Sequence, residues 1–197
     1  MDKTIEEQEY DIVKSHFPVD YRGVVIDIGA NEPIFQNNSY KLEQEGWDCY
    51  CVEPNPRWTD ELKKIRKNVY PIAIGETNND SVDFFRCHAH ENEAAGSGLS
   101  YMPDFDQYKV DKIHVPLRTF EWFLSNEVKK QPDVIFIDVE WAEMKVLSNL
   151  DTNKWKPKLI FIENIEEYHL QRIWFYERGY QRITRIGLDD VYLRGEK

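Results

Sequence analysis

Short apolar runs alternate with helix-like segments along most of this 197-residue chain. The runs are nearly continuous in Val, Ile, Leu and Phe, which is typical of parallel strands that are buried on both faces. The segments between them repeat apolar residues at helical spacing. This alternation predicts an α/β fold: a doubly wound, mostly parallel sheet with helices on both faces, closed by an antiparallel hairpin near the C-terminus.

The bounds of the expected elements follow from turn and capping residues, such as Asn55 and Pro56 at a helix start and Gly46 and Gly179 after helix ends. We expect strands at 23–28, 48–53, 69–75, 133–138, 158–164, 180–186 and 189–195, and further extended segments at 82–87 and 110–116. We expect helices at 4–17, 39–45, 119–129 and 141–150, one that begins at Pro56, and one through Leu170, Ile173 and Trp174.

Length and composition favour one globular domain over 1–197, since 41% of the residues are hydrophobic and 14% aromatic. Within it we expect an N-terminal helical segment at 1–20. The segment 88–110 is expected to act as a lid that shapes an acceptor pocket. The formal net charge of -11 argues against a nucleic-acid partner, because such proteins usually need a basic face.

The sequence also indicates a cellular compartment. The three cysteines form no CxxC pair and no zinc-binding spacing. The acidic N-terminus lacks the apolar core of about 7–15 residues that a signal peptide needs. No apolar run reaches the roughly 18 residues of a membrane span. We therefore expect a reduced, cytoplasmic protein with no membrane partner.

Acidic residues end the expected parallel strands. Asp27 ends the first, Glu53 the second, Asp138 with Glu140 the strand at 133–138, and Glu163 with Asn164 the next. The carboxyl ends of parallel strands meet at one edge of a sheet, where ligands of such folds bind. A row of acids there favours a ligand that carries hydroxyls and a positive charge. The alternative is that these residues only cap helices and form turns.

The loop after the first strand, "DIGANEP", contains one glycine, Gly29, whereas a dinucleotide fingerprint needs two more before a helix. The site therefore has little to hold a pyrophosphate. Glu53, 26 residues after Asp27, is placed to accept hydrogen bonds from both hydroxyls of a ribose. S-adenosylmethionine (SAM) has a ribose, a sulfonium and an amino group but no phosphate. We expect it as the cofactor, with Asp27 and Asp138 near its cationic groups.

The stretches "VVIDIGANEP…NNSYKLEQEGWDCYCVEPNP", "VPLRTFEWFL" and "DVIFIDVEWAEMKVL" resemble the FkbM-type methyltransferases over about residues 23–193. The resemblance implies a class I methyltransferase fold with seven strands, and O-methyl transfer to a sugar, glycan or natural-product hydroxyl. It implies a first cofactor loop formed by Asp27, Gly29, Ala30 and Asn31, with Ser39 near the cofactor carboxylate. It implies that Glu53 binds the ribose and that Ala73 and Ile74 border the adenine. Asp138 and Glu140 would face the reacting centre.

Trp141 departs from the family, which usually has glycine after "DVE". Its indole could stack on the acceptor, pack under the following helix, or block the pocket. Asp138 and Glu140 are the candidate catalytic bases. The alternatives are His88, which we also expect to contact the acceptor, and two other histidines, His90 and His114.

A metal is a second possibility at the same strand ends. Asp138, Glu163 and Asn164 offer the oxygen ligands that Mg²⁺ prefers, although Glu163 and Asn164 could simply turn the chain. Two other functions stay open. One is an NAD-dependent reductase or epimerase on a Rossmann fold, which the missing glycines disfavour. The other is a SAM-binding domain without catalysis, which Trp141 suggests.

Overall fold

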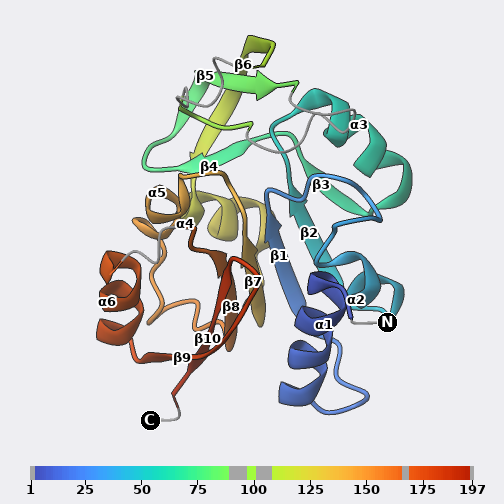
Figure 1. The fold of residues 1–197 in the computed structure, drawn as a ribbon, viewed down its shortest axis with the longest axis vertical. Helices are drawn as coiled ribbons and strands as arrows, with labels where there is room; N and C mark the ends of the chain where they lie inside the picture. Colours follow the sequence, from blue (N-terminus) through green and yellow to red (C-terminus); the bar gives the residue numbers. More distant parts are fainter. Residues whose placement is uncertain (1–2, 89–96, 101–107, 166–168, 196–197) are drawn as a thin grey trace.

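The computed structural model describes residues 3–88, 97–100, 108–165 and 169–195. Within them one seven-stranded sheet has the order β3-β2-β1-β7-β8-β10-β9 (Figure 1). The neighbours pair in parallel, except that β10 runs antiparallel to both β8 and β9. The predicted fold and its C-terminal hairpin are confirmed. The strands are β1 Val24–Ile28, β2 Asp48–Val52, β3 Asn68–Tyr70, β7 Val134–Ile137, β8 Leu159–Glu163, β9 Tyr180–Ile186 and β10 Asp189–Arg194.

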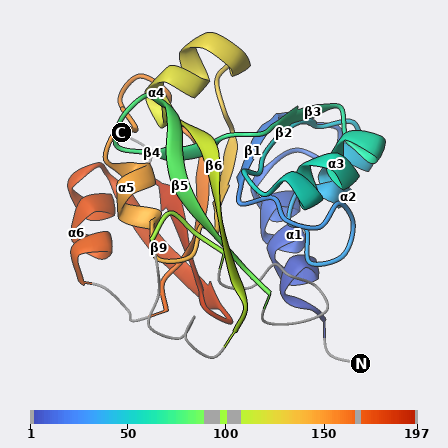
Figure 2. The ribbon, with the colours of Figure 1, turned by 90° about the horizontal axis from the view of Figure 1, so that it is seen from above.

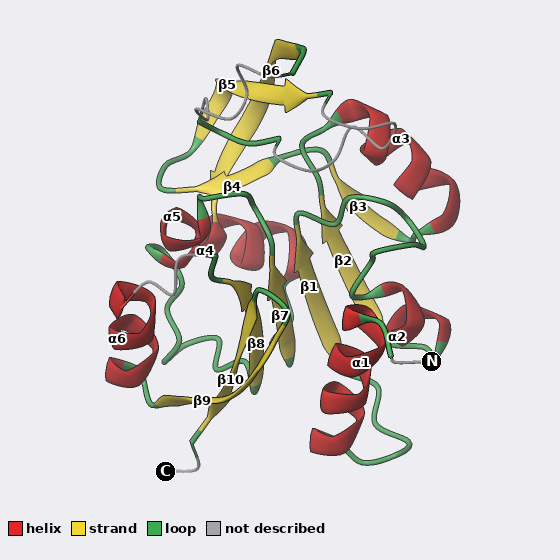
Figure 3. Cartoon of the chain, in the orientation of Figure 1, coloured by secondary structure: helices red, strands yellow, loops and turns green. Residues whose placement is uncertain are grey.

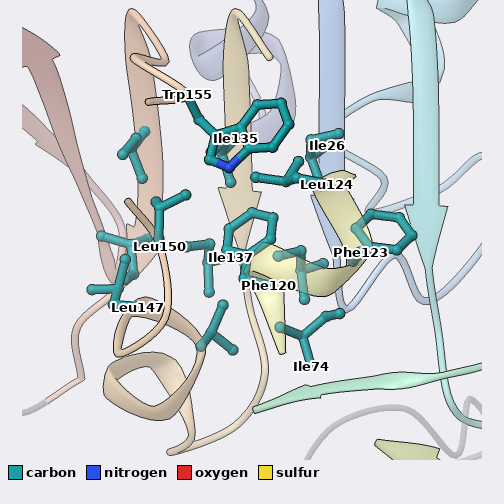
Figure 4. Packing of buried hydrophobic residues seen from close by; sticks show 14 of the residues in the cluster. Ile26, Ile74, Phe120, Phe123, Leu124, Ile135, Ile137, Leu147, Leu150 and Trp155 are labelled. Atoms are coloured by element: carbon teal, nitrogen blue, oxygen red, sulfur yellow. The ribbon is translucent and has the colours of Figure 1, made fainter. Parts of the chain in front are cut away.

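Helices cover both faces of this sheet (Figure 2). Ile26 and Ile28 of β1 pack with residues of α4, η2, α5 and α6 in the larger core cluster, part of which Figure 4 shows. Val25 packs on the other face with α1 and α2, and Leu62 of α3 packs against Cys51 there. The helices are α1 Ile5–His16, α2 Tyr40–Gln44, α3 Pro56–Ile65, α4 Phe120–Phe123, the π-helical turn η2 Leu124–Val128, α5 Glu143–Leu147 and α6 His169–Glu177. No described helix is both long and apolar enough to cross a membrane.

The prediction of one strand over 69–75 is wrong, because the chain bends at Pro71. β3 ends at Tyr70 in the main sheet, and β4, Ala73–Gly75, joins a second sheet of order β4-β6-β5 (Figure 3). Proline has no backbone N–H for a ladder, which favours a break here. The other members of this small sheet are β5, Asn79–Cys87, and β6, Val110–Thr119, where the sequence predicted shorter extended segments.

Two predicted helices also differ in detail. The segment 119–129 is helical but changes from α4 into the π-helical turn η2. The helix expected at 141–150 is shorter, since α5 starts only at Glu143. Glu140 and Trp141 have φ angles of 53° and 69°, in the left-handed region that cannot continue an α-helix.

Gly29 lets the ends of β1 and β7 approach closely. Its φ is 86°, and a Cβ atom at this position would lie 1.7 Å from the carbonyl oxygen of Asp138. The amide of Asp138 donates to the carbonyl of Ile28 at 3.0 Å, which extends the pairing of the two strands. The close neighbour of Gly29 is therefore the backbone at the end of β7.

Gly29→Ala should therefore destabilise the fold by about 3–5 kcal/mol, the sum of left-handed strain and a backbone clash. Gly179→Ala is the matched control, because Gly179 also has a positive φ of 78° but a Cβ there meets nothing within 4 Å. It should cost only about 1–2 kcal/mol. Urea unfolding of both variants measures the difference. Equal losses would show that the contact with Asp138 imposes no constraint.

Candidate functional site

A cavity of about 480 Å³ opens at the carboxyl ends of β1, β2, β7 and β8. This is the expected ligand position on a sheet of this kind, and the volume is typical of small-molecule sites. Its wall also includes residues of α1, of the small sheet and of the turn before β10. Most of the predicted site residues line it: Asp27, Gly29, Ala30, Asn31, Glu53, Ala73, Ile74, Asp138, Glu140 and Glu163.

Glu53 lies at the end of β2 and is nearly buried. Its Oε2 atom accepts a hydrogen bond from the Asn31 amide at 2.9 Å, and Oε1 accepts one from the Asn55 amide at 2.7 Å. Burial raises the pKa of Glu53 to about 7, although these two hydrogen bonds favour the charged form. A carboxylate has about four lone-pair sites, so the group can still accept two hydrogen bonds from a ligand.

Asp27 is part of a buried polar network. Ser39 donates from Oγ to Asp27 Oδ2, and Arg66 donates to Ser39 Oγ at 2.7 Å and to Asn37 Oδ1 at 2.8 Å. Arg66 also forms a buried ion pair with Glu43. Burial raises the pKa of Asp27, while Ser39 and Arg66 oppose that rise. Ser39, predicted near the cofactor carboxylate, is fully buried and lies outside the residues that line the cavity.

The same network fixes the first loop. Asn37 donates from Nδ2 to the carbonyls of Ala30 at 2.7 Å and Glu32 at 2.9 Å. Neither Arg66 nor Asn37 is predicted as a site residue from the sequence. Nothing local marks Arg66, which follows α3 directly and reads as one more charged residue at a helix end.

The ends of β7 and β8 and the start of β10 bring carboxyls together. Asp138 lines the cavity and is accessible from it, although protein surrounds its carboxyl on the other sides; desolvation by that protein, and then Glu140, raise its pKa well above the ordinary value. Burial and then Asp138 raise the pKa of Glu163 to about 9. Burial raises the pKa of Asp189 to about 6. At neutral pH Asp138 and Glu163 therefore favour their protonated forms, whereas Asp189 is mostly ionised.

Several buried polar atoms in the cavity wall lack a partner among the described residues. They are the acceptors Asn31 Oδ1 and Glu163 Oε2 and the donors Asn55 Nδ2 and Trp58 Nε1. Buried polar groups in folded proteins are almost always paired. These unpaired atoms indicate that the cavity binds a polar ligand that forms hydrogen bonds with them.

Other predicted residues are not brought into the cavity wall. Trp141 is 39% exposed and is not among the lining residues, although its sequence neighbours Glu140 and Ala142 are. His88 Nε2 lies 2.8 Å from Oδ2 of Asp111, near the start of β6. His114 Nε2 lies 3.2 Å from Asp83 Oδ1. His90 and most of the expected lid, 89–96 and 101–107, fall outside the described residues.

Two of the predicted magnesium ligands, Asp138 and Glu163, line the cavity, and the third, Asn164, is not among the lining residues. Asn164 is buried, and its Nδ2 donates to Asp190 Oδ2 at 2.8 Å. In the described part of the chain, no group of three or more His, Cys, Asp or Glu side chains is arranged to hold a metal ion. The structure gives no support for a set made of Asp138, Glu163 and Asn164, which stays a prediction.

Comparison with known proteins places these features in a family. The family model described as "Methyltransferase FkbM domain" matches residues 27–182. A crystal structure of methyltransferase FkbM from Methylobacillus flagellatus KT aligns at 15% identity and a TM-score of 0.54. The alignment covers 87% of this chain and 43% of that chain, so this chain spans less than half of its length.

A second alignment, to precorrin-6y C5,15-methyltransferase from Geobacter metallireducens GS-15, has 11% identity and a TM-score of 0.43 and covers 96% and 89% of the two chains. No curated protein matches this chain in sequence.

The raised carboxyl pKa values predict how stability depends on pH. Asp189, Glu53 and Glu163 bind protons in the folded protein up to pH values of about 6, 7 and 9. The unfolded chain releases them near pH 4, so the free energy of unfolding falls as pH rises from about 5.5 to 8. Urea midpoints of the ligand-free protein should follow this slope, with a total change on the order of 1 kcal/mol or more.

Glu163→Gln should flatten the slope, because it removes a carboxyl whose pKa is raised to about 9. Glu61→Gln, a change of an exposed carboxylate on α3, should keep it. A wild-type stability that is flat or rises over this range would contradict the assignment of buried protonated carboxyls.

Proposed function

The chain belongs to the FkbM methyltransferase family, and from that premise we propose that it transfers a methyl group from SAM to a hydroxyl of a sugar, glycan or natural product. Membership implies SAM-dependent methyl transfer. The acceptor class and the choice of oxygen are the proposal. The absence of further glycines after Gly29 supports SAM over NAD as the occupant.

Glu53 is the observation that carries the cofactor assignment. Its carboxyl faces the cavity from the end of β2, and the amides of Asn31 and Asn55 hold it there. Two free acceptor positions suit a pair of vicinal hydroxyls. In the proposed complex Glu53 would hold the ribose, and the buried Ala73 and Ile74 would border the adenine.

The other contacts of the cofactor follow from charge. Gly29, Ala30 and Asn31 would form the loop beside the methionine part, and Asp27, in its buried network, would favour the amino group. The unpartnered Nδ2 of Asn55 and Nε1 of Trp58 would find acceptors on a polar ligand. The residues present therefore fit SAM, which supplies the methyl group on a positively charged sulfur.

Asp138 and Glu140 would supply the base. A hydroxyl is a poor nucleophile near neutral pH, so its proton must move to a nearby group as the oxygen–carbon bond forms in line with the breaking sulfur–carbon bond. A carboxylate whose pKa is raised accepts that proton more readily, and desolvation raises the pKa of Asp138. The positive charge of bound SAM would favour the ionised form of Asp138, so that it can accept the proton. Trp141, next to Glu140 and partly exposed, would contact the acceptor at the rim.

Removal of the ribose acid tests the cofactor assignment. Glu53→Ala should weaken binding of S-adenosylhomocysteine (SAH) by about 10- to 100-fold, because two hydrogen bonds to a charged group are lost. Glu53→Gln, which keeps one acceptor, should lie between. Tryptophan fluorescence reports binding, since Trp58 lines the cavity. The control Glu61→Ala should bind like the wild type, and NAD⁺ should not bind. Unchanged affinity in Glu53→Ala would refute the ribose role.

A transfer assay tests the chemistry. SAM with a ¹³C-labelled methyl group is incubated with a panel of sugars and polyols, and the products are analysed by NMR. We expect an O–CH₃ signal, and a rate about 10²- to 10⁴-fold lower in Asp138→Asn. A methyl group found on nitrogen, sulfur or carbon, or an unchanged rate in Asp138→Asn, would overturn the proposed reaction.

A further inference from the structure

We propose that Arg66, which lies outside the cavity wall, is a positioning residue for the methyl donor. It acts through Ser39 on Asp27, so that Asp27 can bind the ammonium group of the donor, and through Asn37 on the loop after β1. The inference rests on the proposed function and deepens it, because it says which residue prepares the donor site for that ammonium group.

Each of the three nitrogens of the Arg66 guanidinium has its own acceptor. Nε donates to Glu43 Oε2, Nη1 donates to Asn37 Oδ1 at 2.8 Å, and Nη2 donates to Ser39 Oγ at 2.7 Å. The side chain of Arg66 is fully buried. A lysine carries its donors on one nitrogen atom and does not match this planar fork, so the arrangement requires arginine.

The first branch of the network leads to Asp27. Ser39 precedes α2 at the N-cap position, but its hydroxyl does not cap the helix. The hydroxyl donates to Asp27 Oδ2 and accepts from Arg66. A hydroxyl that accepts a hydrogen bond from a cation becomes a stronger donor. Arg66 therefore stabilises, through Ser39, the charged form of a carboxylate that lines the cavity.

The second branch leads to the loop after β1. Asn37 Oδ1 accepts from Arg66 and from the amide of Tyr40, both at 2.8 Å, so the opposite end of the side-chain amide faces the loop. There Asn37 Nδ2 donates to the carbonyls of Ala30 and Glu32. Ala30 lines the cavity. Arg66 thus supports two parts of the cavity wall through intermediate side chains.

The charge of Arg66 is set against several acids around Asp27. Burial and Glu43 raise the pKa of Asp27, and Ser39 and Arg66 lower it. The carboxyls that interact electrostatically with Asp27 are those of Glu9, Glu43, Glu53 and Asp138. Without Arg66, Asp27 would keep a proton more readily, and a neutral carboxyl attracts an ammonium group less strongly.

Stability alone is a weak explanation for the buried pair of Arg66 and Glu43. The cost of desolvating two charges can exceed the energy of their attraction, and apolar residues can often replace such a pair without loss of stability. In this protein the same guanidinium also fixes Ser39 and Asn37, which both contact residues of the cavity wall. Its position is therefore explained by the site that it supports.

The preference for the amino group of the donor tests this role. The probes are SAH and the SAH analogue in which hydrogen replaces the amino group. Their dissociation constants are measured by calorimetry at constant pH and salt. We expect the wild type to bind SAH at least about tenfold more tightly than the analogue, the effect of one charge-assisted contact. Arg66→Met should reduce this ratio to about threefold or less. A merely structural role would weaken both probes equally and keep the ratio.

Three further variants locate the effect. Ser39→Ala removes the link to Asp27 but keeps the ion pair of Arg66 with Glu43, and it should also reduce the ratio. Arg66→Lys keeps the positive charge and should restore part of the ratio that Arg66→Met loses. Asp27→Asn should itself have a low ratio, and Arg66→Met added to it should lower the ratio no further, because both changes act on the same carboxylate.

Arg194→Met is the matched control. Arg194 is also partly buried, and it donates to the carbonyl of Thr152 at the opposite edge of the sheet, so this variant should keep the full ratio. Urea unfolding checks that each variant is folded; if Arg66→Met is not, Ser39→Ala decides. Three results would overturn the inference: a full ratio in Arg66→Met or Ser39→Ala, a wild type without preference, or a further fall when Arg66→Met is added to Asp27→Asn.

The failure of this inference can be told apart from failure of the proposed function. SAH binding to the wild type is measured first and by itself. If SAH does not bind, the cofactor assignment fails, and this inference fails with it. If SAH binds and the ratio does not depend on Arg66, the cofactor assignment stands and only the role of Arg66 is wrong.

Discussion

The gathering of several carboxyls at one edge of the sheet is the constraint on which the rest of the structure depends. Asp27, Glu53, Asp138 and Glu163 end four neighbouring strands, so their positions cannot be relaxed without moving the core. Ile26, Ile28 and the other core residues on both faces of the sheet keep these strands in register. Apolar burial therefore offsets the cost of holding like charges together, and a cationic ligand recovers part of that cost.

The protein treats the two ends of this acidic row differently. At the β1 and β2 end, a buried arginine, a serine and backbone amides compensate Asp27 and Glu53 within the chain itself. These groups are preorganised in the protein without a ligand and can fix the orientation of a nucleoside. At the β7 and β8 end the carboxyls keep protons because burial raises their pKa values. A cation bound at that end would favour the charged forms of these carboxyls and so release protons.

The sequence was sufficient for the fold and for the row of acids, because both follow from local patterns. Apolar runs define strands, and the residue after each run is placed by the parallel topology alone. It was insufficient where a role depends on distant packing. Arg66 meets Ser39 and Asp27 only after α3 has packed on the sheet. The end of β3 at Tyr70 depends on which sheet the next residues join. Trp141 takes left-handed backbone angles that no residue type there predicts.

Proton release on cofactor binding tests the central claim most directly. SAM is titrated into the protein at pH 7 in phosphate and in Tris, two buffers with different ionisation enthalpies, and the heats are compared. A cation that binds among protonated carboxyls stabilises their charged forms, so the account predicts net release of protons. Equal heats in the two buffers, or a net uptake of protons, would contradict it.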